Sequence, residues 1–361
     1  QKLDHFNPAC TATWLQRYAV RLENYDGNNL VFLFIGGHSV IQNAWLRHGH
    51  MSRLAEKFNA AEFIIEHRFY GGSKPKPDLS LESLTFLSSE QALADLACFV
   101  KGMNILHGFN NPKWIVFGGA YAGSLAAWLR YKYPHLVFAA VSSSSPLQAK
   151  VDFPGGTFFL NSKAPCYSKR ITVLIVIQVH RYAEVNKLLS TYFGEKCVDH
   201  TYNGMVTELQ DTSYGPENNY WRQWYYQICL EFGWHQSSGK KDDTFGDQFP
   251  TQFFIDICTD VYGPSFINDH LNASTEETNT KYGGKSLPVL RVVFVQGSID
   301  PTSILGIIKN PPEGIAQCAD MLPETRDDPP QLIEARKKIK QIVGDWISEK
   351  KRQSTKRAFI F

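Results

Sequence analysis

The stretch with the clearest chemical meaning spans residues 117–129. An apolar segment leads into Gly118, Gly119, Ala120, Tyr121, Ala122 and Gly123, and an apolar helical pattern follows. A strand that ends in Gly-x-Ser-x-Gly and turns sharply into a helix presents a serine that attacks carbonyl carbons. Here Ala120 occupies the apex, so the turn is expected without its hydroxyl. An ordinary glycine-rich turn between a strand and a helix gives the same pattern, and the motif alone leaves both interpretations open.

The residues after this turn show which other catalytic groups the sequence provides. In hydrolases built around such a turn, an acid and then a histidine follow the nucleophile, each after a later strand. Residues 292–295 form an apolar run typical of a buried strand, and Asp300 follows it in a loop. No histidine occurs after His270. The sequence therefore offers Asp300 as the acid and provides no histidine in the expected place.

The elements that would position these residues follow an α/β pattern. Continuous apolar runs at residues 31–35, 63–65, 114–117 and 137–141 are typical of strands buried on both faces. Helical periodicity follows Ser88, where Cys98 is expected as a buried free thiol, and again follows the glycine-rich turn. This alternation predicts a doubly wound α/β sheet. A last helix is expected near residues 329–347, and the irregular, aromatic middle is interpreted as a mostly helical insertion.

Several motifs together resemble the serine carboxypeptidase family that includes lysosomal Pro-Xaa carboxypeptidase and thymus-specific serine protease. The resemblance covers nearly the whole chain except residues 154–182. The matching stretches are residues 3–7, 66–71, 86–95, 118–128, 144–153, 232–234, 249–250, 297–301 and 318–321.

The resemblance implies an α/β-hydrolase fold with an inserted, shortened helical cap. Residues 1–153 and 286–361 would form the hydrolase domain and residues 154–285 the cap. It also implies residence in a secreted or lysosomal/endosomal compartment and exopeptidase activity often directed at proline. Cys229 and Cys258, which lie beside family-like stretches, are expected to form a disulfide.

Carried onto this chain, the family's catalytic positions are altered. The nucleophile falls on Ala120, the histidine falls on Gln317, and the acid is retained as Asp300. The backbone N–H groups of Tyr121 and Gly37 would remain from the oxyanion hole.

Three hypotheses remain open. The chain is an inactive homologue whose cleft binds a peptide or protein ligand, an active peptidase if Ala120 was engineered or the site is rescued, or an interaction protein with an unused cleft. Rescue would need a new Ser–His pair. Ser124 and His38 are the candidates, but Ser124 is expected to point along its helix.

Composition excludes other classes of function. The net charge is +2 with both signs mixed along the chain, which argues against a nucleic-acid partner. The longest purely apolar run, residues 173–177, is far too short to span a bilayer, and no signal peptide is expected in this chain. No cysteine pair has zinc-site spacing, so neither a metal nor a cofactor is predicted. Asn272 begins a glycosylation sequon, and a homodimer is compatible with the sequence.

Overall fold

The computed structural model describes residues 1–153, 201–216, 219–238, 249–297, 300–308 and 328–348, with isolated positions beyond these ranges. Within the described residues, seven strands form one sheet in the order β1-β3-β2-β4-β5-β8-β9. Its strands are β1 (Tyr18–Arg21), β2 (Leu30–Ile35), β3 (Ala61–Ile65), β4 (Lys113–Gly119), β5 (Ala139–Ser143), β8 (Val292–Val295) and β9 (Phe359–Ile360).

The sheet is parallel except at one edge. Only β1 among the described strands of this sheet pairs antiparallel, with β3, whereas β3, β2, β4, β5, β8 and β9 run in the same direction. Every residue of β2, β3, β5 and β8 is buried. Continuous apolar runs are what a parallel sheet covered on both faces requires, so the predicted central strands are confirmed.

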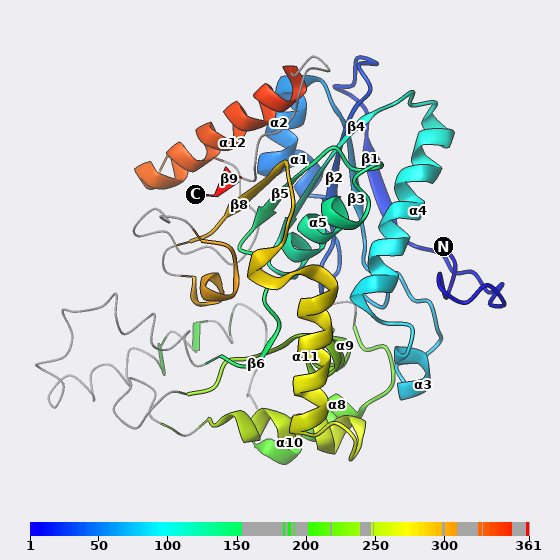
Figure 1. The fold of residues 1–361 in the computed structure, drawn as a ribbon, viewed down its shortest axis with the longest axis vertical. Helices are drawn as coiled ribbons and strands as arrows, with labels where there is room; N and C mark the ends of the chain where they lie inside the picture. The colour runs from blue at the N-terminus through cyan, green and yellow to red at the C-terminus, as the bar shows by residue number, and fades with distance from the viewer. Residues whose placement is uncertain are drawn as a thin grey trace, which may run out of the picture.

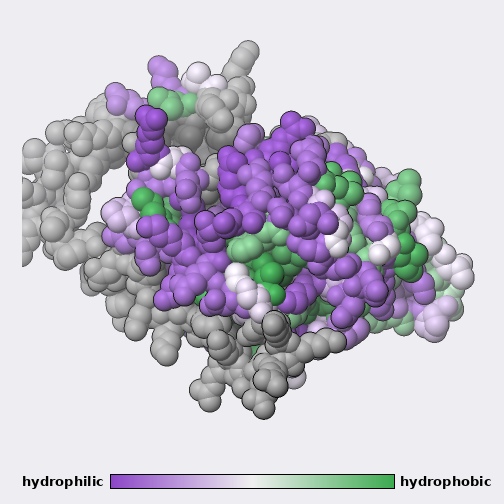
Figure 2. All heavy atoms as spheres, turned by 90° about the horizontal axis from the view of Figure 1, so that it is seen from above, coloured by the Kyte–Doolittle hydropathy of each residue, from purple (hydrophilic) through white to green (hydrophobic). Residues whose placement is uncertain are grey.

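Helices cover both faces of the sheet and create two apolar cores. On one face α1 (Trp45–His48), α2 (His50–Phe58) and α12 (Pro330–Ser348) pack on alternate residues of the strands. On the other face lie α4 (Ser89–His107) and α5 (Tyr121–Lys132). Figure 1 shows α2 and α12 together at one side of the sheet and α4 at the other. Seen from the end where α2 and α12 lie, the described surface is mostly hydrophilic (Figure 2).

Helix α4 begins and ends on clear local signals. The Ser88 hydroxyl accepts a hydrogen bond from the Gln91 N–H at its start, and Gly108 ends it with a φ of 66°. The expectation of a buried Cys98 is wrong, because this residue is exposed. Position 98 lies about 100° around the helix from Ala97, so it leaves the face that packs on the sheet.

The middle of the chain adds elements outside this sheet. They are β6 (Lys150–Asp152), α8 (Tyr202–Gln210), α9 (Trp221–Gln227), a π-helical turn η1 (Ile228–Phe232), β7 (Gly233–His235), α10 (Thr251–Tyr262), α11 (Asn268–Tyr282) and η2 (Gly284–Ser286). Strands β6 and β7 form a separate parallel pair. Figure 1 shows α8 and α10 at the end of the molecule opposite α2 and α12. Buried side chains of η1, α10 and α11 nevertheless share one core with α4 and α5.

Two short helices complete the described elements, α3 (Leu81–Leu84) and η3 (Pro301–Leu305). This topology is the α/β-hydrolase fold that the sequence predicts. No helix among the described residues is long and apolar enough to cross a membrane.

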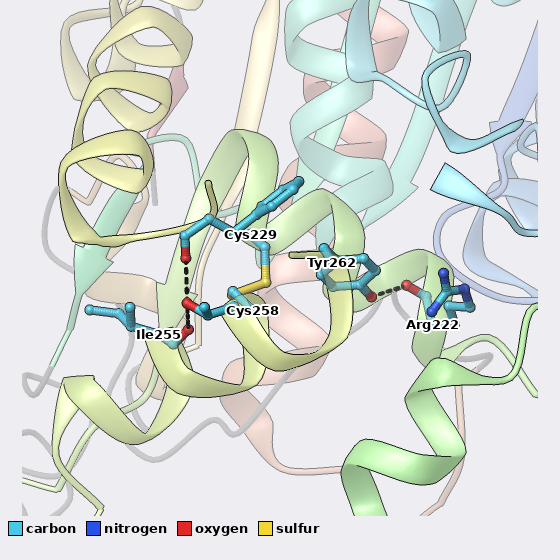
Figure 3. Close-up of a disulfide and its surroundings, with 7 residues drawn as sticks. Arg222, Cys229, Ile255, Cys258 and Tyr262 are labelled. Atoms are coloured by element: carbon cyan, nitrogen blue, oxygen red, sulfur yellow. Dashed lines mark hydrogen bonds between the residues drawn. A yellow bond between two sulfur atoms is a disulfide. The ribbon is translucent and has the colours of Figure 1, made fainter. Parts of the chain in front are cut away.

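A disulfide ties η1 to α10, as the resemblance predicts. Cys229 and Cys258 are bonded with a Cα–Cα distance of 5.7 Å (Figure 3). Nearby, the Tyr262 hydroxyl donates to the Arg222 carbonyl at 2.6 Å, which joins α10 to α9. The covalent bond and the hydrogen bond thus fix α10 to two consecutive segments, η1 and α9.

Candidate functional site

The turn that begins at the end of β4 has the shape of a nucleophile elbow. Strand β4 ends at Gly119, helix α5 starts at Tyr121, and Ala120 alone connects them with φ 53° and ψ −127°. A residue with a Cβ rarely adopts this conformation, and residues held in it cluster at functional sites. The Ala120 N–H donates to the Ser143 carbonyl at 3.0 Å, and its own carbonyl accepts from the Gly123 N–H at 2.9 Å. The elbow is therefore kept although its apex carries only a methyl group.

Two glycines explain why the turn can be so sharp. A Cβ on Gly118 would collide with the Ala122 carbonyl, and one on Gly123 would lie 2.7 Å from the Ser143 carbonyl oxygen. Helix α5 thus approaches β4 and β5 more closely than any side chain permits.

The carboxyl ends of three strands meet beside this turn. Gly119 pairs with Ser143, and Ser143 pairs with Val295, so β4, β5 and β8 end at the same edge. Asp300 follows β8 and is fully buried. Its Oδ1 accepts from the Thr302 N–H at 2.9 Å and from the Thr302 hydroxyl at 2.7 Å. Since neighbouring strands lie about 4.8 Å apart, β4 and β8 end about 10 Å from each other.

Gln317 lies outside the described residues, so its expected approach to Ala120 stays a prediction.

The two expected oxyanion donors belong to neighbouring segments. A Cβ on Gly37 would lie 3.5 Å from the Ala122 nitrogen, so the turn after β2 lies against the start of α5. The first N–H groups of a helix have no partner within the helix, and the N–H of Tyr121, the first residue of α5, is one of them. The next residue, His38, stacks on Trp224 with ring centroids 4.3 Å apart. Burial lowers the pKa of His38 to about 4, so its ring is neutral at pH 7.

Ser124 does not face this turn. Its hydroxyl is buried in α5 and donates to the Pro146 carbonyl at 2.6 Å. The ring contacts of His38 are with Trp224 and Tyr220. The substitute Ser–His pair considered from the sequence is therefore not assembled.

A family comparison identifies the scaffold. The model of the serine carboxypeptidase S28 family matches residues 1–169 and 161–339. The chain belongs to this family. It is 29% identical to the mouse thymus-specific serine protease, over 98% of this chain and 88% of that protein. It is 39% identical to the human lysosomal Pro-X carboxypeptidase over 165 residues, which are 44% of this chain and 33% of that one.

The mouse protein is longer than this chain over the aligned region. The alignment with the mouse protein spans 451 positions, more than the 361 residues of this chain, so that protein has residues that this S28 member lacks.

Among solved structures, a proline iminopeptidase from Mycobacterium smegmatis aligns with 13% identity and a TM-score of 0.40, over 92% of this chain and 99% of that one. This similarity is too low to inform the function.

A one-directional chain of hydrogen bonds holds the residue after the apex of this S28 elbow. Tyr70 donates to Gln227 Oε1 at 2.6 Å, and Gln227 Nε2 donates to the Tyr121 hydroxyl at 3.0 Å. His67 Nδ1 lies 2.7 Å from the Arg68 carbonyl oxygen, which can only accept, so Nδ1 carries the proton. His67 Nε2 therefore accepts from the Tyr121 hydroxyl at 3.1 Å. Burial lowers the pKa of His67 to about 4, and the ring stays neutral.

A buried ion pair explains three of the S28-like sequence motifs. The Arg68 guanidinium donates to both Asp95 oxygens, at 2.6 and 2.8 Å, and both side chains are fully buried. Arg68 Nη1 also donates to the Leu3 and Phe86 carbonyls, and His5 Nε2 lies 2.7 Å from Asp95 Oδ1. Residues 3–7, 66–71 and 86–95 thus meet at one point. Sequence reasoning missed this network, although charged residues beside apolar runs could have signalled it.

Proposed function

We propose that this chain is a catalytically inactive S28 peptidase homologue whose remaining cleft binds a peptide or a protein partner. The observation that carries the proposal is the elbow at Ala120, which keeps a strained backbone with no nucleophile at its apex. A methyl group cannot form an acyl-enzyme, and loss of the nucleophile alone costs on the order of 10⁶ in turnover.

The remaining catalytic positions agree with this proposal. Asp300 is retained at the end of β8, where an acid would orient a histidine. The family pattern puts Gln317 where that histidine belongs, and an amide cannot accept the proton of a hydroxyl or of water. Two losses in one site favour natural decay over a single engineered change.

Ligand binding at this site requires neither the nucleophile nor the base that catalysis requires. The backbone N–H groups of Gly37 and Tyr121 could still hold a carbonyl oxygen of a ligand. Around them lie the half-buried rings of Tyr220, Trp224 and Trp234, which offer apolar surface to a peptide side chain. Ligand recognition at this remnant is therefore compatible with the absence of turnover.

An oxidising compartment fits the chain. Among the relatives are a lysosomal carboxypeptidase and an extracellular serine carboxypeptidase from Arthroderma benhamiae. Disulfides such as Cys229–Cys258 persist outside the cytosol. Asn272 is exposed on α11, where a glycan would project into solvent. We propose secretion or lysosomal residence with glycosylation at Asn272, and a homodimer remains compatible with this assignment.

The proposed division of the chain is residues 1–153 and 286–361 as the hydrolase domain, with residues 154–285 as a shortened cap. Elements of that middle range add no described strand to the main sheet. They share a core with α4 and α5, which indicates that the cap folds on the hydrolase domain and not by itself.

A fluorophosphonate probe tests the loss of catalysis. We expect no covalent labelling of the unchanged chain and little in Ala120→Ser, because the new hydroxyl lacks a base. The double variant Ala120→Ser with Gln317→His is a sharper test, because it restores both the hydroxyl and the base. Ser124→Ala is the matched control, because it removes the other serine considered as a nucleophile. Labelling of the unchanged chain, removed by Ser124→Ala, would support the alternative of an active serine exopeptidase for proline-containing peptides.

A binding measurement tests the second half of the proposal. Calorimetric titration with proline-containing peptides should give a saturable heat that Trp224→Ala weakens. Absence of binding to the folded chain would instead favour an interaction protein whose cleft is unused.

A further inference from the structure

Glu231 joins the middle of the chain to the first turn of α4. It lies on η1, and its carboxylate accepts from the Ser89 N–H at 2.9 and 3.1 Å and from the Ser89 hydroxyl at 2.9 Å. Ser89 is the first residue of α4, and the N–H groups of a first helical turn favour a negative charge beside them. The Ser89 hydroxyl also lies 2.8 Å from the Tyr282 hydroxyl on α11. One carboxyl group therefore connects η1, α4 and α11.

The same carboxyl group is linked to the elbow. Gln227, one helical turn before it, donates to the Tyr121 hydroxyl at 3.0 Å, and the ring of Phe232, the residue after Glu231, lies 5.3 Å from the ring of Tyr121. Tyr121 directly follows Ala120 at the apex. The short η1 segment thus contacts the α4 joint through Glu231 and the residue after the elbow apex through Phe232.

Burial raises the pKa of Glu231 to about 7, against the opposing effects of Ser89, Lys281 and Gln227. Lys281 on α11 is itself paired with Glu90 on α4 at 3.1 Å. The other titratable groups that face Glu231 are hydroxyls whose raised pKa keeps them neutral, namely Tyr70, Tyr121, Tyr226 and Tyr282. Glu231 is therefore the group in this cluster whose charge changes near neutral pH.

Protonation of Glu231 reverses the donor and the acceptor in two hydrogen bonds. When Glu231 is neutral, its O–H donates to the Ser89 oxygen and the Ser89 hydroxyl donates to Tyr282. When Glu231 is ionised, Ser89 donates to the carboxylate and Tyr282 donates to Ser89. The ionised form leaves a charge in a fully buried site, so it favours any opening that hydrates it.

We propose that Glu231 is a proton-binding switch that loosens the joint between the middle region and α4, and with it the elbow at Ala120, when it ionises. The inference goes beyond the proposed function and does not depend on whether the chain is active. A compartment that is acidic would keep the joint closed.

Hydrogen exchange followed by mass spectrometry tests the switch. Exchange of peptides covering residues 89–92 and 119–123 is measured at pH 6 and pH 8 and corrected for intrinsic rates. We expect both peptides to open about tenfold more at pH 8, because ionisation is disfavoured only in the closed form. Glu231→Gln should abolish the difference. Glu90→Gln, a matched change on the half-exposed neighbour, should keep it.

Two outcomes would overturn the proposal, namely an unchanged pH dependence in Glu231→Gln or a response confined to α4 that leaves the elbow unaffected. If Glu231→Gln does not fold, the protonation of Glu231 is followed by infrared spectroscopy. The measurement is made in Glu62→Gln, because burial also raises the pKa of Glu62 to about 7 and its signal would overlap. That variant should retain one protonated carboxyl group at pH 6 that disappears by pH 8. Absence of this signal would overturn the proposal as well.

Discussion

The strained apex of the elbow makes Ala120→Gly an informative substitution. Ala120 has a φ of 53° and a ψ of −127°, a conformation that glycine adopts without steric cost. The turn cannot relax, because Gly118 and Gly123 hold α5 tightly against β4 and β5. Because the backbone is held in place, removing the Cβ should relieve this strain.

The expected stabilisation follows from opposing terms. A non-glycine residue in this region costs about 1–3 kcal/mol. Glycine loses about 0.4–1 kcal/mol through the greater entropy of the unfolded chain, and the half-buried methyl of Ala120 contributes about 0.5 kcal/mol. With mid-range values for these terms, Ala120→Gly should raise the free energy of unfolding by about 1 kcal/mol.

Urea unfolding of matched variants measures this difference. Ala126→Gly, in the helical interior of the same α5, is the control and should destabilise by about 1 kcal/mol or more. Opposite signs for the two substitutions would support a retained elbow. Equal destabilisation by both would refute the reasoning, because Ala120 would then behave like an ordinary residue of a strand or helix.

Three further perturbations probe the scaffold. Asp95→Asn leaves the buried Arg68 charge without its partner and should cost about 3–5 kcal/mol in urea unfolding, and a cost below about 1 kcal/mol would contradict the assigned ion pair. Replacing Cys229 and Cys258 by serine opens a cross-link between residues 29 apart and should cost about 3–4 kcal/mol, with an unchanged urea midpoint as the contrary result. Acidification from pH 6.5 to 5 should lower the free energy of unfolding, because histidines bind protons in the unfolded chain but stay neutral when buried in the folded one. Each buried histidine contributes at most about 1.4 kcal/mol per pH unit. The pKa is lowered to about 4 in four histidines: His38, His50, His67 and His235. Glu62 and Glu231, with pKa values raised to about 7, oppose this slope, so a free energy of unfolding that rises on acidification would show that they dominate.

The sequence by itself determined the frame of the molecule. Apolar runs at β2, β3, β4, β5 and β8 predict a covered parallel sheet, since a strand buried on both faces is made mostly of apolar residues without alternation. The glycines around Ala120 predict the sharp turn, because only residues without a Cβ allow so close an approach of helix to strand. The Cys229–Cys258 bond came from the family resemblance, not from spacing.

The tertiary structure decided what depends on distant partners. Arg68 and Asp95 are 27 residues apart, and Glu231 meets Ser89 across 142, so no local period relates them. The edge strand β1 is four residues with half-exposed side chains, too weak a pattern to stand out. The exposure of Cys98 was set by how α4 rotates onto the sheet. Local patterns record which face of a segment is buried, whereas pairing of buried charges depends on contacts that form only when the whole chain has folded.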